Sequence, residues 1–163
     1  MFAIAARRAS RVIFSPSTFS SAAIFRTTSS VQPLYRTVTM SATPVFSKDA
    51  APPAGPYSHA IKTPTAIYCS GQIPCDSEGN LVEGTIQEKT AACIKNLKAV
   101  LEAAGSSIEK VVKVNAFLTD MSNFAAMNEE YSKWFTHKPA RSCVAVYQLP
   151  KGVDVEIECI AIP

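Results

Sequence analysis

The 163-residue sequence lacks any apolar run of roughly 18 residues, the length that a membrane-spanning helix needs, and this excludes an integral membrane protein. No segment repeats at a spacing of about 20–50 residues, which argues against a solenoid. The five cysteines form no C-x-x-C pair, and their odd number fits neither a secreted disulfide framework nor a zinc ribbon. With 47% hydrophobic and 18% charged residues, the chain can bury the core of one ordinary domain.

Acidic residues are also absent from the first 40 positions, where five of the basic residues lie. The rest of the chain has eleven basic and thirteen acidic residues, so its net charge is −2 and the overall charge of +3 comes from the N-terminal segment. This segment mixes arginine with serine, threonine and short apolar groups, which is typical of a mitochondrial presequence. A secretory signal needs an unbroken apolar stretch, which the arginines interrupt. The alternative is a basic tail without a targeting role. The five basic residues are Arg7, Arg8, Arg11, Arg26 and Arg36.

We therefore expect residues 1–40 to be a disordered presequence, bound by the import machinery and cleaved between Arg26 and Met40. Residues 41–163 would then form the functional domain in the mitochondrial matrix. Met40 is also a candidate start for a shorter, cytosolic form.

Two helices are expected in residues 41–163. The first begins at Thr85, which forms a capping box with Glu88, and ends at Gly105. The second has Ser122 as its N-cap and ends before Pro139.

The remaining segments read as loops and strands. Residues 44–56 are rich in proline, alanine and glycine, which favours an extended loop. Strands are expected at residues 66–70, 108–118, 142–147 and 153–162, with the first stopping at Gly71. This order predicts an α+β fold: a single mixed β-sheet with two helices packed on one face.

Strand alternation separates the side chains of the sheet into two faces. In the last strand, Ile157 and Glu156 point to opposite faces. In the strand before it, Arg141 and Cys143 share a face, and Val144 lies on the other. Two helices cover only one face, and the second face is still partly apolar, so we expect a homo-oligomer whose sheets pack together. The alternative is a monomer with a mixed surface.

Five segments together resemble the RidA/YjgF/YER057c/UK114 family of imine deaminases. They follow one another in the family's order over most of residues 54–158. The resemblance implies a chorismate-mutase-like fold and a homotrimer with sites in the clefts between subunits, and the N-terminal segment points to the fungal mitochondrial branch. The segments are A-G-P-Y-S at 54–58, S-G-Q-I-P at 70–74, N-L-K-A-V-L-E-A-A-G at 96–105, P-A-R-S-C-V at 139–144 and V-E-I-E at 155–158.

The resemblance also implies an activity. Members hydrolyse reactive enamines and imines, such as 2-aminoacrylate, 2-iminopropanoate and 2-iminobutanoate, to 2-keto acids and ammonia without a metal or organic cofactor. This would protect pyridoxal-phosphate enzymes and support branched-chain amino-acid synthesis and mitochondrial maintenance. Two alternatives remain: a non-catalytic ligand-binding or interaction protein, and a ribonuclease-like translation inhibitor. The net charge of −2 in residues 41–163 argues against nucleic-acid binding.

Two charged residues match the family's catalytic positions. Arg141 is the candidate clamp for the substrate carboxylate, because a guanidinium can form two parallel hydrogen bonds to it. Glu156 is the candidate acid that positions or activates water. The alternative roles are a surface salt bridge for Arg141 and, for Glu156, the solvent face of a strand that also carries Asp154 and Glu158.

Five further residues match positions that line the family's pocket and bind its substrate: Tyr57, Ser70, Gly71, Asn128 and Cys143. Cys143 is not expected to be a nucleophile, because no histidine lies near it in a triad-like pattern. The four other cysteines are expected to be small core residues, and neither histidine is assigned a role.

Overall fold

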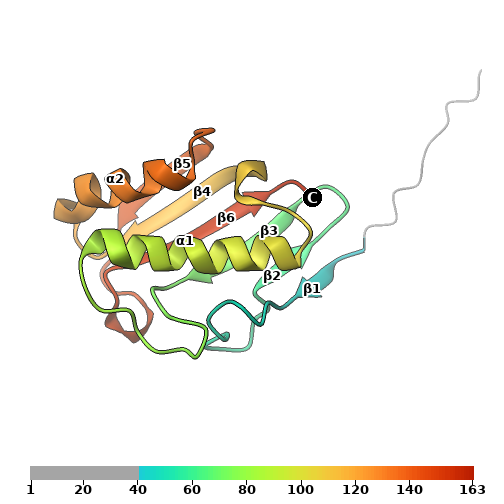
Figure 1. Ribbon diagram of the computed structural model, residues 1–163, viewed down its shortest axis with the longest axis horizontal. Coiled ribbons are helices and arrows are strands. Elements are labelled where there is room, and N and C mark those ends of the chain that lie inside the picture. The colour runs from blue at the N-terminus through green and yellow to red at the C-terminus, as the bar shows by residue number, and fades with distance from the viewer. Residues whose placement is uncertain (1–40) are drawn as a thin grey trace, which may run out of the picture. The chain divides into compact units, whose positions relative to one another are not determined.

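The computed structural model describes residues 41–163, which form a six-stranded sheet with two helices (Figure 1). The prediction of a presequence lies outside the described residues. The strands are β1 (Thr43–Val45), β2 (Ala60–Lys62), β3 (Ile67–Gln72), β4 (Val111–Leu118), β5 (Ala140–Ala145) and β6 (Val155–Ala161). The helices are α1 (Ile86–Ala103) and α2 (Phe124–Trp134), and short 3-10 turns lie at Ile108–Lys110, Met121–Asn123 and Pro150–Gly152.

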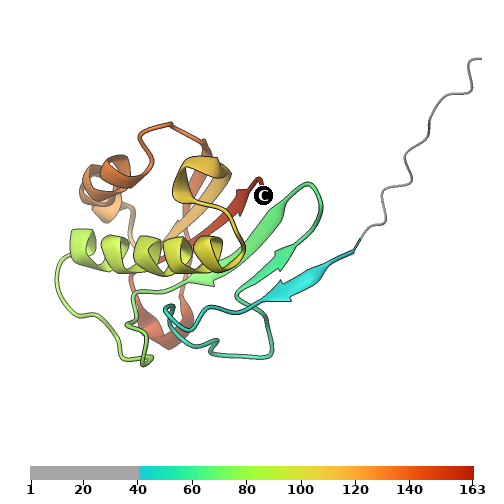
Figure 2. The ribbon, with the colours of Figure 1, turned by 45° about the vertical axis from the view of Figure 1, so that its right-hand side comes forward.

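The sheet is mixed, with strand order β1-β2-β3-β6-β4-β5. Only β4 and β5 pair in parallel, and α2 connects them, as a parallel crossover requires. Both helices lie on the same side of the sheet (Figures 1 and 2). The predicted architecture of one mixed sheet with two helices on one face is therefore confirmed.

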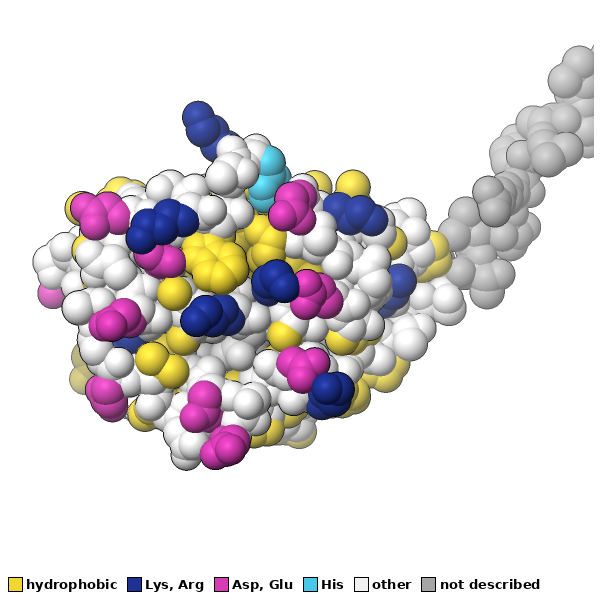
Figure 3. Space-filling view, viewed as in Figure 1, with side chains coloured by type: hydrophobic (Ala, Val, Ile, Leu, Met, Phe, Trp, Pro, Cys, Tyr) yellow, Lys and Arg dark blue, Asp and Glu magenta, His cyan; other side chains and the backbone are white. Residues whose placement is uncertain are grey.

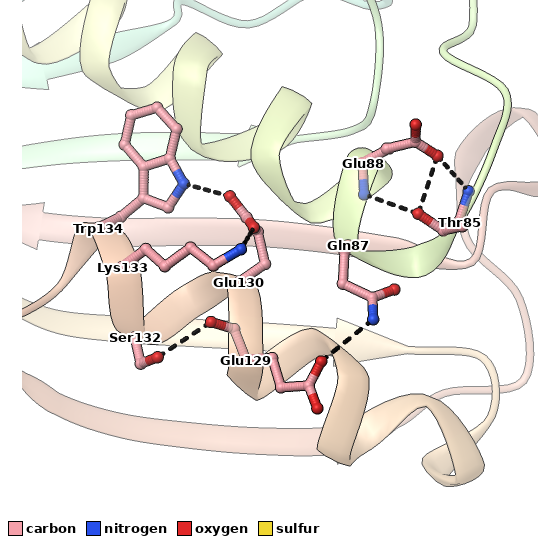
Figure 4. Close-up of polar contacts among 8 residues, drawn as sticks. All are labelled: Thr85, Gln87, Glu88, Glu129, Glu130, Ser132, Lys133 and Trp134. Atoms are coloured by element: carbon pink, nitrogen blue, oxygen red, sulfur yellow. Dashed lines mark hydrogen bonds and ion pairs between the residues drawn. The ribbon is translucent and has the colours of Figure 1, made fainter.

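Helix α1 begins and ends as the sequence predicts. The Thr85 hydroxyl accepts a hydrogen bond from the Glu88 amide at 3.3 Å, and the Glu88 carboxylate accepts one from the Thr85 amide at 2.8 Å (Figure 4). These reciprocal bonds satisfy two amides that the first turn leaves without a partner. Gly105, with a φ of +78°, ends the helix in the left-handed conformation that glycine adopts freely.

Helix α2 starts differently from the prediction. The predicted cap, Ser122, is not the residue whose side chain caps this end. Instead, the Asp120 carboxylate caps the 3-10 turn before α2 by accepting a hydrogen bond from the Ser122 amide at 2.8 Å. Gln87 of α1 donates to the Glu129 carboxylate of α2 at 3.3 Å, which links the two helices at their exposed side (Figure 4).

Several strand boundaries also differ. The predicted loop at 44–56 begins within β1, and β2 was missed, because three-residue strands carry too few positions to show alternation. Pro44 is compatible with β1 because this strand is at the sheet edge, where a missing amide donor breaks no inner ladder. Strand β3 continues through Gly71, and residues 108–110 form a 3-10 turn before β4. Strand β5 lies two residues earlier than predicted.

The core lies between the helices and one face of the sheet. Leu97 and Leu101 of α1 are fully buried with Val114 of β4 and Ile157 of β6. The opposite face is open: the exposed fractions of Tyr68 on β3 and Val144 on β5 are 50% and 47%. Over residues 41–163, neither helix has the length and hydropathy of a membrane span.

We expect Thr85→Ala to lower the free energy of unfolding by about 1 kcal/mol, because the first turn of α1 loses its capping bond. Urea unfolding monitored by circular dichroism measures this, and the exposed Thr65→Ala is the control. Equal stability of the two variants would contradict a stabilising role for the cap.

Candidate functional site

The predicted site residues divide between the two faces of the sheet. In the strand register, Arg141 pairs with Val114 and Cys143 with Ala116, and both partners are buried under the helices. Paired residues in a sheet project to the same face, so Arg141 and Cys143 lie on the helix-bearing side. Glu156 pairs instead with Phe117, which alternates with these core residues on β4, and therefore lies on the open face.

Arg141 is held by aromatic rings. Its guanidinium carbon lies 4.5 Å from the ring centroid of Tyr131 and 5.7 Å from that of Phe124, both on α2. These cation–π contacts orient the guanidinium without neutralising it. Within residues 41–163, none of the ion pairs involves Arg141, so its donors are available to a ligand carboxylate.

A groove of about 520 Å³ opens beside Arg141. Asn128 lies on the same face of α2 as the two aromatic residues, four positions after Phe124 and three before Tyr131. Among residues 41–163, the Asn128 side-chain oxygen and the Tyr131 hydroxyl are both buried without a hydrogen-bond partner. Burial raises the pKa of Tyr131 to about 12, so the hydroxyl keeps its proton at neutral pH and can donate. The groove is lined by Tyr131, Ser132, Phe135, Thr136, Lys138, Pro139 and Arg141.

The thiol of Cys143 is not activated as a nucleophile. Burial raises its pKa above the ordinary value, and the opposing effect of Arg141 is smaller. A thiol in this state is mostly protonated at neutral pH, unlike the thiolate that nucleophilic cysteines need. The other four cysteines are buried, as predicted; among them, Cys69 and Cys159 face each other across β3 and β6.

On the open face, Gly71 and Glu156 are in close contact. The pairing of β3 with β6 is irregular between Cys69 and Gln72, which places Gly71 in a bulge. A methyl group at position 71 would overlap Oε1 of Glu156 and lie 2.8 Å from its Cδ. Glycine therefore provides the space in which the Glu156 carboxylate lies against the β3 backbone.

The Glu156 carboxyl is partly desolvated in this position. Burial raises its pKa above the ordinary value, and repulsion from Glu158 adds to the effect. Glu158 itself accepts a hydrogen bond from Asn115 at 2.7 Å. A carboxylate with a raised pKa is a stronger base, which suits a group that takes a proton from water.

Tyr57 and Ser70 lie near Gly71 at this end of the sheet. Tyr57 lines the same recess as Gly71, and its hydroxyl oxygen accepts a hydrogen bond from the Ala54 amide at 3.0 Å. The Ser70 hydroxyl donates to the Ser58 carbonyl at 2.7 Å. In this arrangement Ser70 can accept a hydrogen bond from a ligand but cannot donate to its carboxylate.

The structure thus groups the predicted site residues into two clusters, which we call half-sites of the predicted site: Asn128 and Cys143 lie with Arg141 on the helix-bearing side, and Tyr57 and Ser70 lie near Gly71, which contacts Glu156. Sequence reasoning did not find the aromatic support of Arg141, because Phe124 and Tyr131 fit the apolar stripe of a core helix equally well. Among residues 41–163, no three His, Cys, Asp or Glu side chains gather closely enough to hold a metal ion.

Comparisons with known proteins define the family. The family model described as Endoribonuclease L-PSP matches residues 47–163. Protein HMF1 of Saccharomyces cerevisiae is 54% identical over 120 residues, which cover 73% of this chain and 93% of HMF1. The mitochondrial protein MMF1 of the same yeast is 47% identical over 131 residues, covering 80% of this chain and 90% of MMF1. The chain therefore belongs to the RidA/YjgF/L-PSP family.

Solved structures agree with this assignment. The crystal structure of YEO7_yeast superposes with a TM-score of 0.74 at 53% identity, covering 75% of this chain and 98% of the other. The crystal structure of E. coli TdcF, which holds bound serine, superposes with a TM-score of 0.71 at 34% identity, covering 74% of this chain and 98% of TdcF.

The raised pKa of Glu156 predicts a pH-dependent penalty on stability. The folded state holds the proton more tightly than the unfolded chain does, so ionisation destabilises the fold as pH rises from the unfolded pKa, about 4.3, through the higher folded value. We expect Glu156→Gln to gain stability relative to wild type between pH 4 and pH 7.5.

Urea unfolding at these two pH values and one fixed protein concentration measures the difference. The exposed Glu83→Gln is the matched control and should show a smaller change. A difference between Glu156→Gln and wild type that is the same at both pH values would contradict a desolvated Glu156.

Proposed function

We propose that the chain is a 2-iminobutanoate/2-iminopropanoate deaminase that works as a homotrimer with active sites between subunits. The observation that carries this proposal is the placement of Arg141 and Glu156 on opposite faces of one sheet. A site that uses both residues needs two copies of the chain, one giving the Arg141 half-site and the other the Glu156 half-site.

The open face of the sheet is the surface proposed for subunit contact. Ile61, Tyr68 and Val144 expose large apolar side chains there, and this is also the face from which Glu156 projects. Contact between copies would bury these side chains and bring Glu156 to a subunit boundary.

The chemistry follows from the two half-sites. Arg141 binds the substrate carboxylate through paired hydrogen bonds, on a guanidinium that the Tyr131 ring orients. Glu156 accepts a proton from water as the water oxygen bonds to the imine carbon. The proton held by Glu156 and the hydroxyl proton of the resulting carbinolamine both pass to the nitrogen, the carbon–nitrogen bond breaks, ammonia leaves, and the carbon becomes the carbonyl of a 2-keto acid. 2-Aminoacrylate enters the same route after it tautomerises to 2-iminopropanoate.

The relatives support a small carboxylate substrate. TdcF binds serine, whose carboxylate and amino group on adjacent carbons match the groups that a 2-imino acid presents. The proposed role is to remove such imines before they damage pyridoxal-phosphate enzymes, and so to sustain branched-chain amino-acid synthesis and mitochondrial maintenance.

The name of the matching family model favours a second function, endoribonucleolytic cleavage. The helix-bearing face argues against it. This face has acidic and basic side chains interspersed, without a continuous basic patch (Figure 3). A nucleic-acid site usually carries such a patch, because phosphate contacts supply most of the affinity.

Mixing two inactive variants tests the activity and the shared site together. We expect Arg141→Ala and Glu156→Gln each to lower imine hydrolysis by about a hundredfold or more, because each removes one half of the site. Co-expressed in equal amounts and assembled at random into trimers, the two should recover about a quarter of wild-type activity, since mixed trimers contain one intact site.

The assay generates 2-iminobutanoate from threonine with a dehydratase and traps the remaining imine with semicarbazide. Lys98→Ala, on the exposed side of α1, is the matched control and should retain activity. A wild-type chain that leaves the imine decay unchanged refutes the deaminase. Active wild type with no recovery on mixing refutes only the shared site. Cleavage of RNA by wild type but not by Arg141→Ala would favour the second function.

We also propose that the protein acts in the mitochondrial matrix. The arginine-rich, acid-free composition of residues 1–40 and the mitochondrial relative MMF1 support this location.

We expect a fluorescent protein fused after residues 1–40 to reach the matrix, and glutamine at Arg7, Arg8 and Arg11 to reduce its import, because the positive charge is lost. A chain starting at Met40 should stay in the cytosol. Cell fractionation with protease protection measures this, and a cytosolic fusion of residues 1–40 would contradict the proposed location.

A further inference from the structure

Two buried polar side chains hold the peptide group of Ala51. The Ala51 amide donates to Oδ1 of Asn96 at 3.2 Å, and the Ala51 carbonyl lies 2.8 Å from Nε2 of His59. His59 and Asn96 are only 2% and 4% exposed. The donor and the acceptor of one loop residue are therefore both satisfied by side chains, one from α1 and one from the end of the same loop, as buried polar groups require.

The partners of His59 fix its tautomer. The Ser47 amide, which can only donate, lies 3.0 Å from Nδ1 of His59. Nδ1 must therefore carry the lone pair, and Nε2 carries the proton that it donates to the Ala51 carbonyl. The neutral ring thus joins two points, Ser47 and Ala51, of the loop between β1 and β2.

Asn96 extends this network to β3. Its amide nitrogen donates to the Cys75 carbonyl at 2.9 Å and to the Ile73 carbonyl at 3.4 Å, just after the end of β3. Helix α1, the loop between β1 and β2 and the segment that follows Gly71 are therefore joined through buried hydrogen bonds.

The same loop carries Tyr57 into the recess that His59 and Gly71 also line. The Tyr57 amide donates to the Gly55 carbonyl at 2.9 Å, and this bond links Tyr57 to the loop residues just before it. The backbone at residue 59 is fixed separately, because the His59 carbonyl accepts a hydrogen bond from the Ser70 amide at 2.9 Å. Loss of the His59 side chain would therefore release the Ser47 amide and the Ala51 carbonyl, while the bond from the Ala51 amide to Asn96 and the β2–β3 contact remain.

We propose that His59 is a positioning residue for the active site: its ring holds the loop from Ser47 to Ala51 and thereby places Tyr57 beside Gly71, which contacts Glu156. The inference rests on the proposed deaminase function. His59 does not touch the substrate and acts through Tyr57.

Substitutions at position 59 test this role. His59→Leu fills similar space without hydrogen bonds, and we expect kcat/KM for 2-iminobutanoate to fall about ten- to a hundredfold, because Tyr57 is no longer held. His59→Gln should retain most of the activity, since its side-chain oxygen can accept from the Ser47 amide and its nitrogen can donate to the Ala51 carbonyl. His59→Asn has the same amide on a shorter side chain and should behave like His59→Leu.

A double-mutant cycle shows whether His59 acts through Tyr57. In a Tyr57→Ala background, His59→Leu should have little further effect on kcat/KM, whereas a purely structural role would give additive losses. Amide hydrogen exchange at Ser47, whose amide donates to the His59 ring, should be faster in the leucine variant and unchanged in the glutamine variant.

Three results would overturn the proposal: wild-type kcat/KM in the leucine and asparagine variants, a glutamine variant as impaired as leucine, or additive losses in the cycle. Inactive wild type refutes the deaminase function instead, so the two failures are distinguishable.

Discussion

Burial of α1 and α2 against a single face of the sheet is the constraint on which the rest of the structure depends. Leu97, Leu101 and Ile157 lose all contact with solvent there, and such burial supplies most of the free energy of folding. Residues 41–163 provide no further layer for the second face. Strand alternation then separates the charged residues, with Arg141 under α2 and Glu156 on the uncovered side.

The two half-sites differ in their physical character. Around Arg141, aromatic rings leave a positive charge oriented and without a counter-ion among residues 41–163. Around Glu156, burial and the neighbouring Glu158 make a negative charge less stable than in water. The Arg141 half-site therefore favours a negatively charged group, and the Glu156 half-site favours uptake of a proton.

The sequence predicts the features that arise from local or periodic patterns. The capping box of Thr85 and Glu88, the end of α1 at Gly105 and the shared face of Arg141 and Cys143 each need only a few neighbouring residues. The resemblance to the family identified the residues of both half-sites, although their roles stay predictions.

Other features depend on contacts between distant segments and leave no pattern. The three-residue strands β1 and β2 are too short to show periodicity. Asp120, rather than the predicted Ser122, caps the 3-10 turn before α2. His59 looked like an ordinary loop residue, since its partners are backbone groups that any sequence provides. Alternation of side chains along each strand distinguishes two faces of the sheet. Only the strand register shows that Glu156 lies on the open face and not on the helix-bearing face.

The contact between Gly71 and Glu156 has a consequence for how this sequence can change over time. Any side chain at position 71 needs the space that the Glu156 carboxylate occupies, so a substitution there forces that carboxylate to move. Because the obstructing atoms are the end of a flexible side chain, the fold can accept an alanine at 71 if the Glu156 carboxylate leaves this position. The two residues lie far apart in the chain, yet selection on the position of the proposed base at 156 would also act on position 71.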